Sequence, residues 1–317
     1  MPLASVEQRQ FGLKKETVRG TPEASPAKWY PVLSDSEFKY ELQHLEDMAL
    51  RGVPEMFVPV PGVKAGTAKI KMPLDAQTIG EFLVSLLGSV TSIQQGATPA
   101  YKHTFTRLNN LQKPVYTFFF DRGLSVKAYA LSGVKKLTLQ GPVDNLIMAE
   151  VDALFKSEGP GSIGTPAFPT QKYLSFQHTT FKIDGVQNLN VKTWNLSIDN
   201  NALAYRTINT TQDIVDVLTP GRLKISGGFT IFFQDEVQRN KFLNNTSLSL
   251  QMLVEGETIS APHKYTVDVS LPEVRYTAFP YGEDSGLLAA QAEFEAFFNT
   301  GQNKAIQVDV TNTDTGY

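Results

Sequence analysis

The sequence predicts a mainly β protein of two tandem β-sandwich domains, each flanked by one α-helix. Three observations predict it. A block of residues recurs with a spacing of about half the chain, most segments alternate apolar and polar residues, and a helix-like segment follows the same position in each half.

The internal repeat has the same order of residues in both halves. Each copy holds a Pro-Gly pair, an aspartate and a Phe-Leu pair, at Pro61-Gly62, Asp75 and Phe82-Leu83 and again at Pro220-Gly221, Asp235 and Phe242-Leu243. Flanking echoes pair residues 45–50 with 198–203, 116–117 with 265–266, and 150–155 with 293–298. A duplication of this length indicates two similar domains.

Alternation with a period of two is clearest at 68–74, 223–233 and 248–254. This period predicts strands with one buried and one solvated face, as in antiparallel sheets. Residues 115–120 are more uniformly apolar, which predicts a strand covered on both sides.

Helical spacing appears once in each half. In the first half it is carried by Ile79, Phe82, Leu83, Leu86 and Leu87. We expect Asp75 to cap the start of this helix and Gly88 to end it. The segment after Asp235 has more polar neighbours, which predicts a shorter helix.

Domain boundaries follow from composition. The Gly- and Pro-rich segment 157–170 is the predicted linker between a first domain, 1–156, and a second, 171–317. The polar tail 311–317 is expected to be mobile before assembly.

Charge and composition exclude several classes. The net charge is −3 without a long basic run, which argues against tight nucleic-acid binding. The chain has no cysteine, so disulfides and thiolate metal sites are excluded and a reducing compartment is expected. We expect no signal peptide, and no stretch reaches the ~20 apolar residues needed to cross a bilayer.

Catalytic motifs are not found. The four histidines are scattered without metal-ligand spacing, so no metal is expected. The G-x-G-x-x-G match at 159–164 lacks the following helix of a dinucleotide site, because Pro166 and Pro169 come next. We therefore predict no enzyme activity, no catalytic residues and no cofactor.

Two long apolar connections precede corresponding predicted strands. Their apolar residues are the candidates for contacts between subunits or between rings, namely Pro54, Met56, Phe57, Pro59, Tyr205, Ile208, Ile214 and Val215. Such loops either cover a local core or enter an interface. Their recurrence at equivalent positions favours the interface.

The chain resembles the tail tube proteins of long-tailed bacteriophages. The resemblance is carried by 11–21, by 193–200 followed by a long loop to Pro220-Gly221, and by 271–276. It implies β-sandwiches whose inner sheets join into a β-barrel around a channel. For a chain with two such domains it implies stacked trimeric, pseudo-sixfold rings. The first half departs more from the family pattern, which leaves the strict equivalence of the two domains open.

The resemblance also implies partners and a location. The partners are other copies of the chain and the tape measure, distal tail and terminator proteins, with DNA only in transit and no membrane. The location is the virion tail, assembled in the host bacterial cytoplasm. The polar strand positions Thr193, Asn195, Ser197 and Asp199 are candidates for the channel wall.

Two alternative functions are left open by the sequence. A two-domain β-sandwich could be a binding module for a receptor or glycan, for which Trp29 and Trp194 would be stacking candidates. A tail-tube capping protein would share the fold and differ in whether it polymerises.

Overall fold

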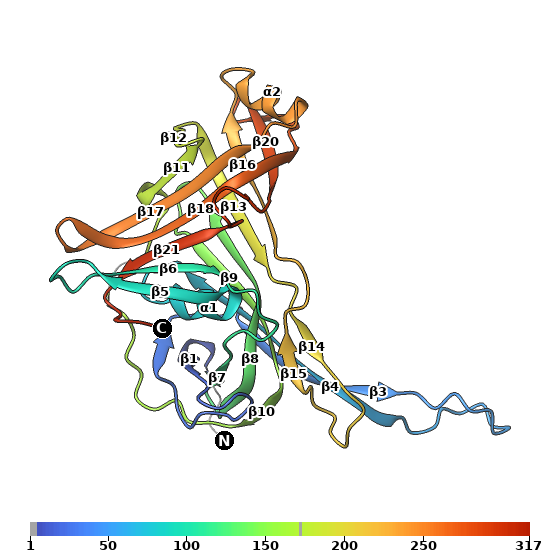
Figure 1. Ribbon diagram of the computed structural model, residues 1–317. Helices are drawn as coiled ribbons and strands as arrows, with labels where there is room; N and C mark the ends of the chain where they lie inside the picture. Colours follow the sequence, from blue (N-terminus) through green and yellow to red (C-terminus); the bar gives the residue numbers. More distant parts are fainter. Residues whose placement is uncertain (1–4, 171–172) are drawn as a thin grey trace.

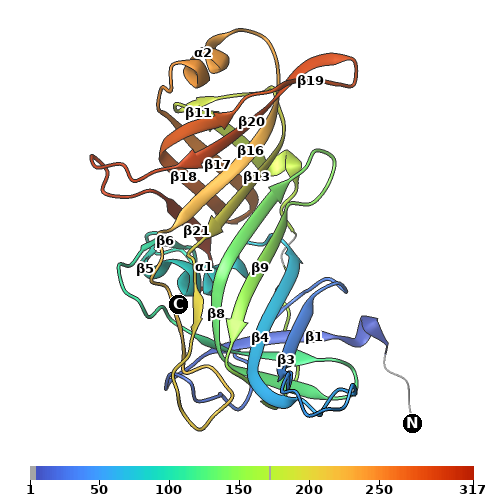
Figure 2. The same ribbon diagram turned by 90° about the vertical axis from the view of Figure 1, so that its right-hand side faces the viewer.

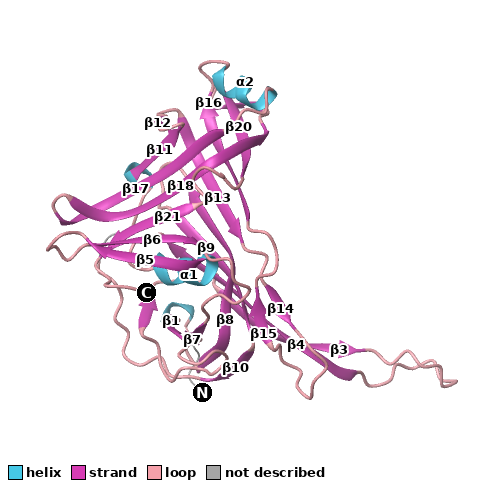
Figure 3. Ribbon diagram, viewed as in Figure 1, coloured by secondary structure: helices cyan, strands magenta, loops and turns pink. Residues whose placement is uncertain are grey.

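The computed structural model describes residues 5–170 and 173–317, and its secondary structure is dominated by strands (Figure 3). The first half contains β1 (Gln10–Lys15), β2 (Lys28–Tyr30), β3 (Glu37–Leu45), β4 (Val60–Pro73), α1 (Ile79–Leu87), β5 (Gly88–Gln94), β6 (Tyr101–Arg107), β7 (Tyr116–Asp121), β8 (Val126–Gly141), β9 (Met148–Phe155) and β10 (Ser157–Pro160). The prediction of a mainly β fold is confirmed.

The second half continues in the same style. It contains β11 (Thr179–Ile183), β12 (Val186–Gln187), β13 (Val191–Asp199), β14 (Leu203–Tyr205), β15 (Asp216–Leu218), β16 (Lys224–Phe232), α2 (Val237–Leu243), β17 (Leu248–Ser260), β18 (His263–Ala278), β19 (Tyr281–Asp284), β20 (Leu287–Ala296) and β21 (Gln307–Asn312). Short 3-10 turns lie at Val6–Gln8 and Phe176–His178.

One continuous sheet runs through both halves. Its strands lie in the order β3-β4-β9-β8-β13-β16-β20-β18, all antiparallel to their neighbours, and we call this series the long sheet. Figure 2 shows β4, β9, β8, β13 and β16 side by side. The two halves are joined within the long sheet where β8 pairs with β13.

β8 and β18 each take part in two layers because they are long. The first residues of β8 pair with β7 and β10, and the later ones with β9 and β13. β18 likewise pairs first with β17 and β21 and then with β20. A second junction forms where β6 of the first half pairs with β21 of the second (Figure 1).

The core of the first half is built around α1. All nine residues of this helix are buried, and Phe82 packs with Phe11, Tyr30 and Phe118. The Phe11 ring is stacked on Phe82 and the other two contacts are edge-on, and aromatic contacts of this kind add to the hydrophobic burial. Residues 116–120 are buried on both faces, as the sequence predicts.

The predicted ends of the helices are confirmed in part. Gly88 ends α1 with φ 94°, a left-handed conformation that glycine adopts without strain, and donates its N–H to the Val84 carbonyl. The helix begins at Ile79, four residues after Asp75, with Thr78 at the cap position, so the prediction of Asp75 as the cap was wrong. Its carboxylate instead accepts the Gln77 N–H, at 3.0 Å.

The second helix is shorter, as predicted. α2 has seven residues against nine in α1, and none of them is buried. The Asp235 carboxylate accepts the Val237 N–H at 2.9 Å. Figure 1 shows α2 at the far end of the molecule, and its Phe242 packs on the rim of the core against Phe279.

The structure also differs from the sequence predictions in three places. Ser157–Pro160 forms β10 on β8, so regular structure enters the predicted linker 157–170. Residues 171–172, the first two of the predicted second domain, lie outside the described residues. The tail 311–317 is packed, not mobile, because β21 extends into it and Tyr317 lies against α1. Residues 116–117 lie in β7 and residues 265–266 lie in β18, so this echo links strands that do not occupy equivalent positions in the two halves.

Candidate assembly surfaces

The polar face of the long sheet carries a row of alternating charges. Cα pairing places in one line across six strands Glu37, Lys69, Asp152, Lys136, Asp199 and Lys224. Three carboxylates and three ammonium groups balance along the row. The apolar residues of the same strands face the core.

Ion pairs link this row to carboxylates of the neighbouring row on the same face, so positive and negative charges are balanced there too. Lys69 lies 2.8 Å from Glu150, and Lys224 lies 3.2 Å from Glu295. The hydrogen bond to Glu150 raises the pKa of Lys69, while burial and then the Glu150 charge raise the pKa of Asp152. The face is therefore polar but has no basic cluster that would hold a phosphate backbone.

The four predicted channel-wall residues lie on this face of β13. Asn195 is exposed, Thr193, Ser197 and Asp199 are half-buried, and the intervening Trp194, Leu196 and Ile198 point into the core. The structure thus brings the four together on one surface, next to the junction with β8.

Both ends of the long sheet are open edges among the described residues. β3 pairs only with β4. Residues 275–278 of β18, and β19 after them, pair only with β20. An open edge presents unpaired backbone N–H and C=O groups, which form a template for another strand.

A long arm projects from the body at the β3–β4 connection (Figure 1). Residues 46–59 form it, and Met48, Leu50, Met56 and Val58 are at least 85% exposed. Phe57 is half-buried beneath the Arg51 guanidinium, 4.3 Å from the ring centroid. The candidates Pro54, Met56, Phe57 and Pro59 all lie on this arm, outside the core.

The corresponding connection of the second half, 200–223, is docked on the first half of its own chain. Ile214 and Val217 are buried there with Val115 and Leu131. Of the other candidates, Ile208 is fully exposed, and Tyr205 and Val215 are each 41% exposed. Sequence reasoning grouped Ile214 with these residues, because an apolar residue in a loop carries no sign of which surface it covers.

Polar contacts fix this docking. The Arg19 guanidinium donates to the Asp216 carboxylate at 2.9 Å and to the carbonyls of Lys113 and Val217. Buried Asn200 donates to the carbonyls of Leu86, at 3.0 Å, and Val134, at 3.1 Å. Arg19 and Asn200 lie in segments that carry the family resemblance, 11–21 and 193–200, but nothing in the sequence indicated this docking, because their partners lie far away along the chain.

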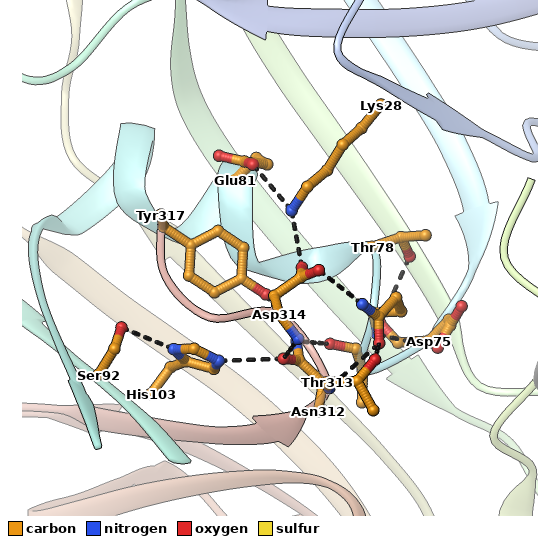
Figure 4. A network of polar contacts seen from close by, with 12 residues as sticks. Lys28, Asp75, Thr78, Glu81, Ser92, His103, Asn312, Thr313, Asp314 and Tyr317 are labelled. Atoms are coloured by element: carbon orange, nitrogen blue, oxygen red, sulfur yellow. Dashed lines mark hydrogen bonds and ion pairs between the residues drawn. The ribbon is translucent and has the colours of Figure 1, made fainter. Parts of the chain in front are cut away.

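A buried network holds the tail on the first half (Figure 4). The side chain of Asn312 donates to the Ala76 carbonyl, at 2.8 Å, and to the Tyr317 hydroxyl, at 2.6 Å. Its oxygen lies 3.0 Å from His103 Nε2. Because that oxygen can only accept, His103 carries its proton on Nε2, and its Nδ1 accepts from Ser92 at 2.7 Å.

Acidic pH is expected to destabilise this network. Burial lowers the pKa of His103 below its ordinary 6.5, because desolvation disfavours the charged ring. The neutral ring's contribution is therefore present above pH ~6.5 and is lost as the pH falls through the lowered folded-state value. Thermal unfolding measured from pH 8 to 5 should show a steeper acid loss for the natural chain than for His103→Gln. Equal slopes would contradict this role.

The described residues contain no group of three or more His, Asp or Glu side chains able to hold a metal ion. None of the described helices is long and apolar enough to span a membrane. Two open sheet edges, an exposed apolar arm and a charge-balanced polar face are typical of a structural subunit that assembles with others.

The comparison with protein families identifies which kind. The model of the phage tail tube protein family matches residues 7–296. The chain therefore belongs to this family, which makes it a structural component of the virion tail that assembles with itself and other tail proteins. No match was found among the curated proteins.

Proposed function

We propose that three copies of this chain close into a ring and that rings stack into the hollow tail tube through which DNA passes. The open edges of the long sheet carry this proposal. A sheet with one open edge at β3 and another at β18–β19 can pair head to tail with further copies, and closure into a barrel removes both edges.

We infer that the two halves of the chain are copies of one structural unit. In support, β1 pairs with β7 and β7 with β8, while β11 pairs with β17 and β17 with β18. Each half thus supplies one of six similar positions around the ring. We keep the proposed domain division at 157–170, so the first unit would end near β10.

The polar face of the long sheet is the proposed channel wall. Its row of alternating charges supports passage of DNA, since a neutral surface releases few counterions on contact with phosphates. The arm 46–59 is the proposed contact to other subunits or rings, because its apolar residues contact no core of their own chain.

Electron microscopy of purified assemblies tests the function. We expect concentrated protein, with or without a tail-assembly nucleus, to form hollow tubes whose end-on views appear sixfold. Light scattering of isolated rings should give three chains. Compact monomers under all of these conditions would contradict the proposal, and single rings that never stack would indicate a capping protein instead.

Adding positive charge to the proposed channel wall should make DNA adhere. Ser197 faces Thr138 and Ser226 on this surface, so Ser197→Lys adds three ammonium groups to each ring. We expect DNA release through the tube to slow, with a salt dependence of roughly 0.9 log units in affinity per log unit of salt for each phosphate neutralised. Thr258→Lys on the exposed β17–β18 hairpin adds the same charge outside the channel and should have no effect.

A further inference from the structure

We propose that the contact between copies repeats the residue register of the contact between the two halves of one chain. β3 of one copy would pair antiparallel with the β18–β19 edge of a second copy, with Glu41 opposite Ala278 and Glu37 opposite Gly282. The proposal rests on the ring described above and adds its register. The internal β8–β13 junction provides the template.

Matching irregularities show how β8 corresponds to β18. In both halves three residues of the long strand stand opposite two of its neighbour, through the pairs Tyr116–Ser132 and Phe118–Tyr129 and through the pairs Leu248–Val274 and Leu250–Leu271. Bulges are specific local features of a ladder, so their coincidence sets the alignment. Ser132 corresponds to Val274.

A second bulge gives the same alignment. The register shifts between Val134 and Lys136 on β8, and between Tyr276 and Ala278 on β18. Lys136 therefore corresponds to Ala278. The correspondence continues into β19, because the pair Leu139–Ala149 matches the pair Tyr281–Ala290.

The alignment of β3 with β13 follows across the sheet. In the first half, neighbouring strands are linked by the pairs Val134–Ala153, Ala153–Ala68 and Ala68–Phe38. In the second half, the equivalent pairs are Tyr276–Phe294, Phe294–Gly227 and Gly227–Leu196. Phe38 therefore corresponds to Leu196, and Glu41 to Asp199. The internal junction pairs Lys136 with Asp199 and Gln140 with Asn195. Transferring these pairs gives Ala278 opposite Glu41 and Gly282 opposite Glu37.

The backbone of the open edge suits this register. The Pro280 carbonyl accepts the Gln291 N–H of β20 at 3.1 Å, so the backbone polar groups of residue 280 are directed toward β20. Because proline has no N–H, its position there leaves all the N–H donors of the open edge in place. The neighbours Phe279 and Tyr281 then direct their N–H and C=O groups outward. The Phe38 carbonyl is held by the partly exposed Arg122, at 3.1 Å, which a pairing strand would replace.

The side chains match as well. The register sets Phe279 opposite Tyr40 and Tyr281 opposite Phe38, on the apolar side of the sheet. Aromatic cross-strand pairs stabilise antiparallel sheets. Tyr281 is 41% exposed in the single chain, so the pairing would bury part of its ring.

Disulfide trapping tests the register without background, since the chain has no cysteine. One double variant carries Glu41→Cys with Ala278→Cys, and another carries Glu37→Cys with Gly282→Cys. Gly282 has open space where a Cβ would stand. In the proposed register both cysteine pairs are non-hydrogen-bonded pairs of an antiparallel ladder, whose Cα atoms lie about 4.5 Å apart, within the range of a disulfide. Lys136→Cys with Asp199→Cys is the internal positive control.

The crossed combinations are matched negative controls. Glu41→Cys with Gly282→Cys, and Glu37→Cys with Ala278→Cys, use the same positions but separate the Cα atoms by about 13 Å. Under mild oxidation of assembled rings we expect covalent dimers and trimers from the two matched variants and none from the crossed ones.

Other outcomes separate the register from the function. Tubes whose matched variants stay uncrosslinked, or whose crossed variants crosslink, overturn the register and leave the proposed function standing. A natural chain that forms neither rings nor tubes overturns both.

Discussion

Replacing the arm 46–59 with Asn-Gly should abolish tube assembly and leave the stability of the single chain unchanged. Leu45 and Val60 are Cα partners across β3 and β4, so a two-residue turn closes the hairpin at that point. The removed segment includes Met48, Leu50 and Met56, which are at least 85% exposed. Its loss takes little buried area from the folded chain and removes the apolar contact surface.

An equally long deletion in the second half is the matched control. Leu203 and Leu218 are also Cα partners, so Asn-Gly can replace 204–217 in the same way. This deletion removes buried Ile214 and Val217 and the Arg19–Asp216 contact. We expect a loss of about 3–6 kcal/mol in the free energy of unfolding, from two buried aliphatic side chains.

Chemical denaturation and electron microscopy of the two deletion variants measure these effects. Tubes from the chain without 46–59 would show that the arm is not an assembly contact. A large loss of stability on its removal would show that it belongs to the core of its own chain.

Asn312→Ala is expected to cost about 3 kcal/mol of folding stability, because several buried groups lose their partner together. Asn312 is fully buried and bonds the Ala76 carbonyl, the Tyr317 hydroxyl and His103. The variant should also release the tail, which would appear as faster amide exchange in 313–317.

Asn195→Ala is the control for this substitution. Asn195 lies exposed on β13, and its loss should change stability by less than ~0.5 kcal/mol. Denaturation curves of both variants, compared at constant m-value, give the loss in free energy of unfolding that each substitution causes. A cost for Asn312→Ala no greater than the control would show that the network does not hold the tail.

Sequence patterns predicted the faces of strands well and their partners poorly. Alternation at 68–74 and 248–254 marks β4 and β17 because burial on one face leaves a period of two. Nothing in the period says that β8 pairs with both β9 and β13, or that β21 pairs with β6. Those contacts join residues far apart in the chain.

The repeat shows the same limit. The spacing of Pro61-Gly62 and Pro220-Gly221 agrees with the alignment through the bulges, because turn and helix positions constrain those residues. The echo of 150–155 with 293–298 is displaced by two residues from the alignment through the bulges, in which Ala153 corresponds to Phe294. Short alternating segments match one another at several offsets, so such an echo does not fix an alignment. For the site, the arm and the polar face of β13 were visible as patterns, whereas the docking by Arg19 and Asn200 was not.

The pairing of β21 with β6 has a consequence for the order of events during synthesis. β6 ends at Arg107, but its neighbour β21 begins only at Gln307. The first half therefore cannot finish its layer while the ribosome is still making the second, and closing so long a loop slows folding. A nascent chain thus lacks the completed body that presents both edges. Polymerisation would then be limited to chains whose synthesis has passed β21.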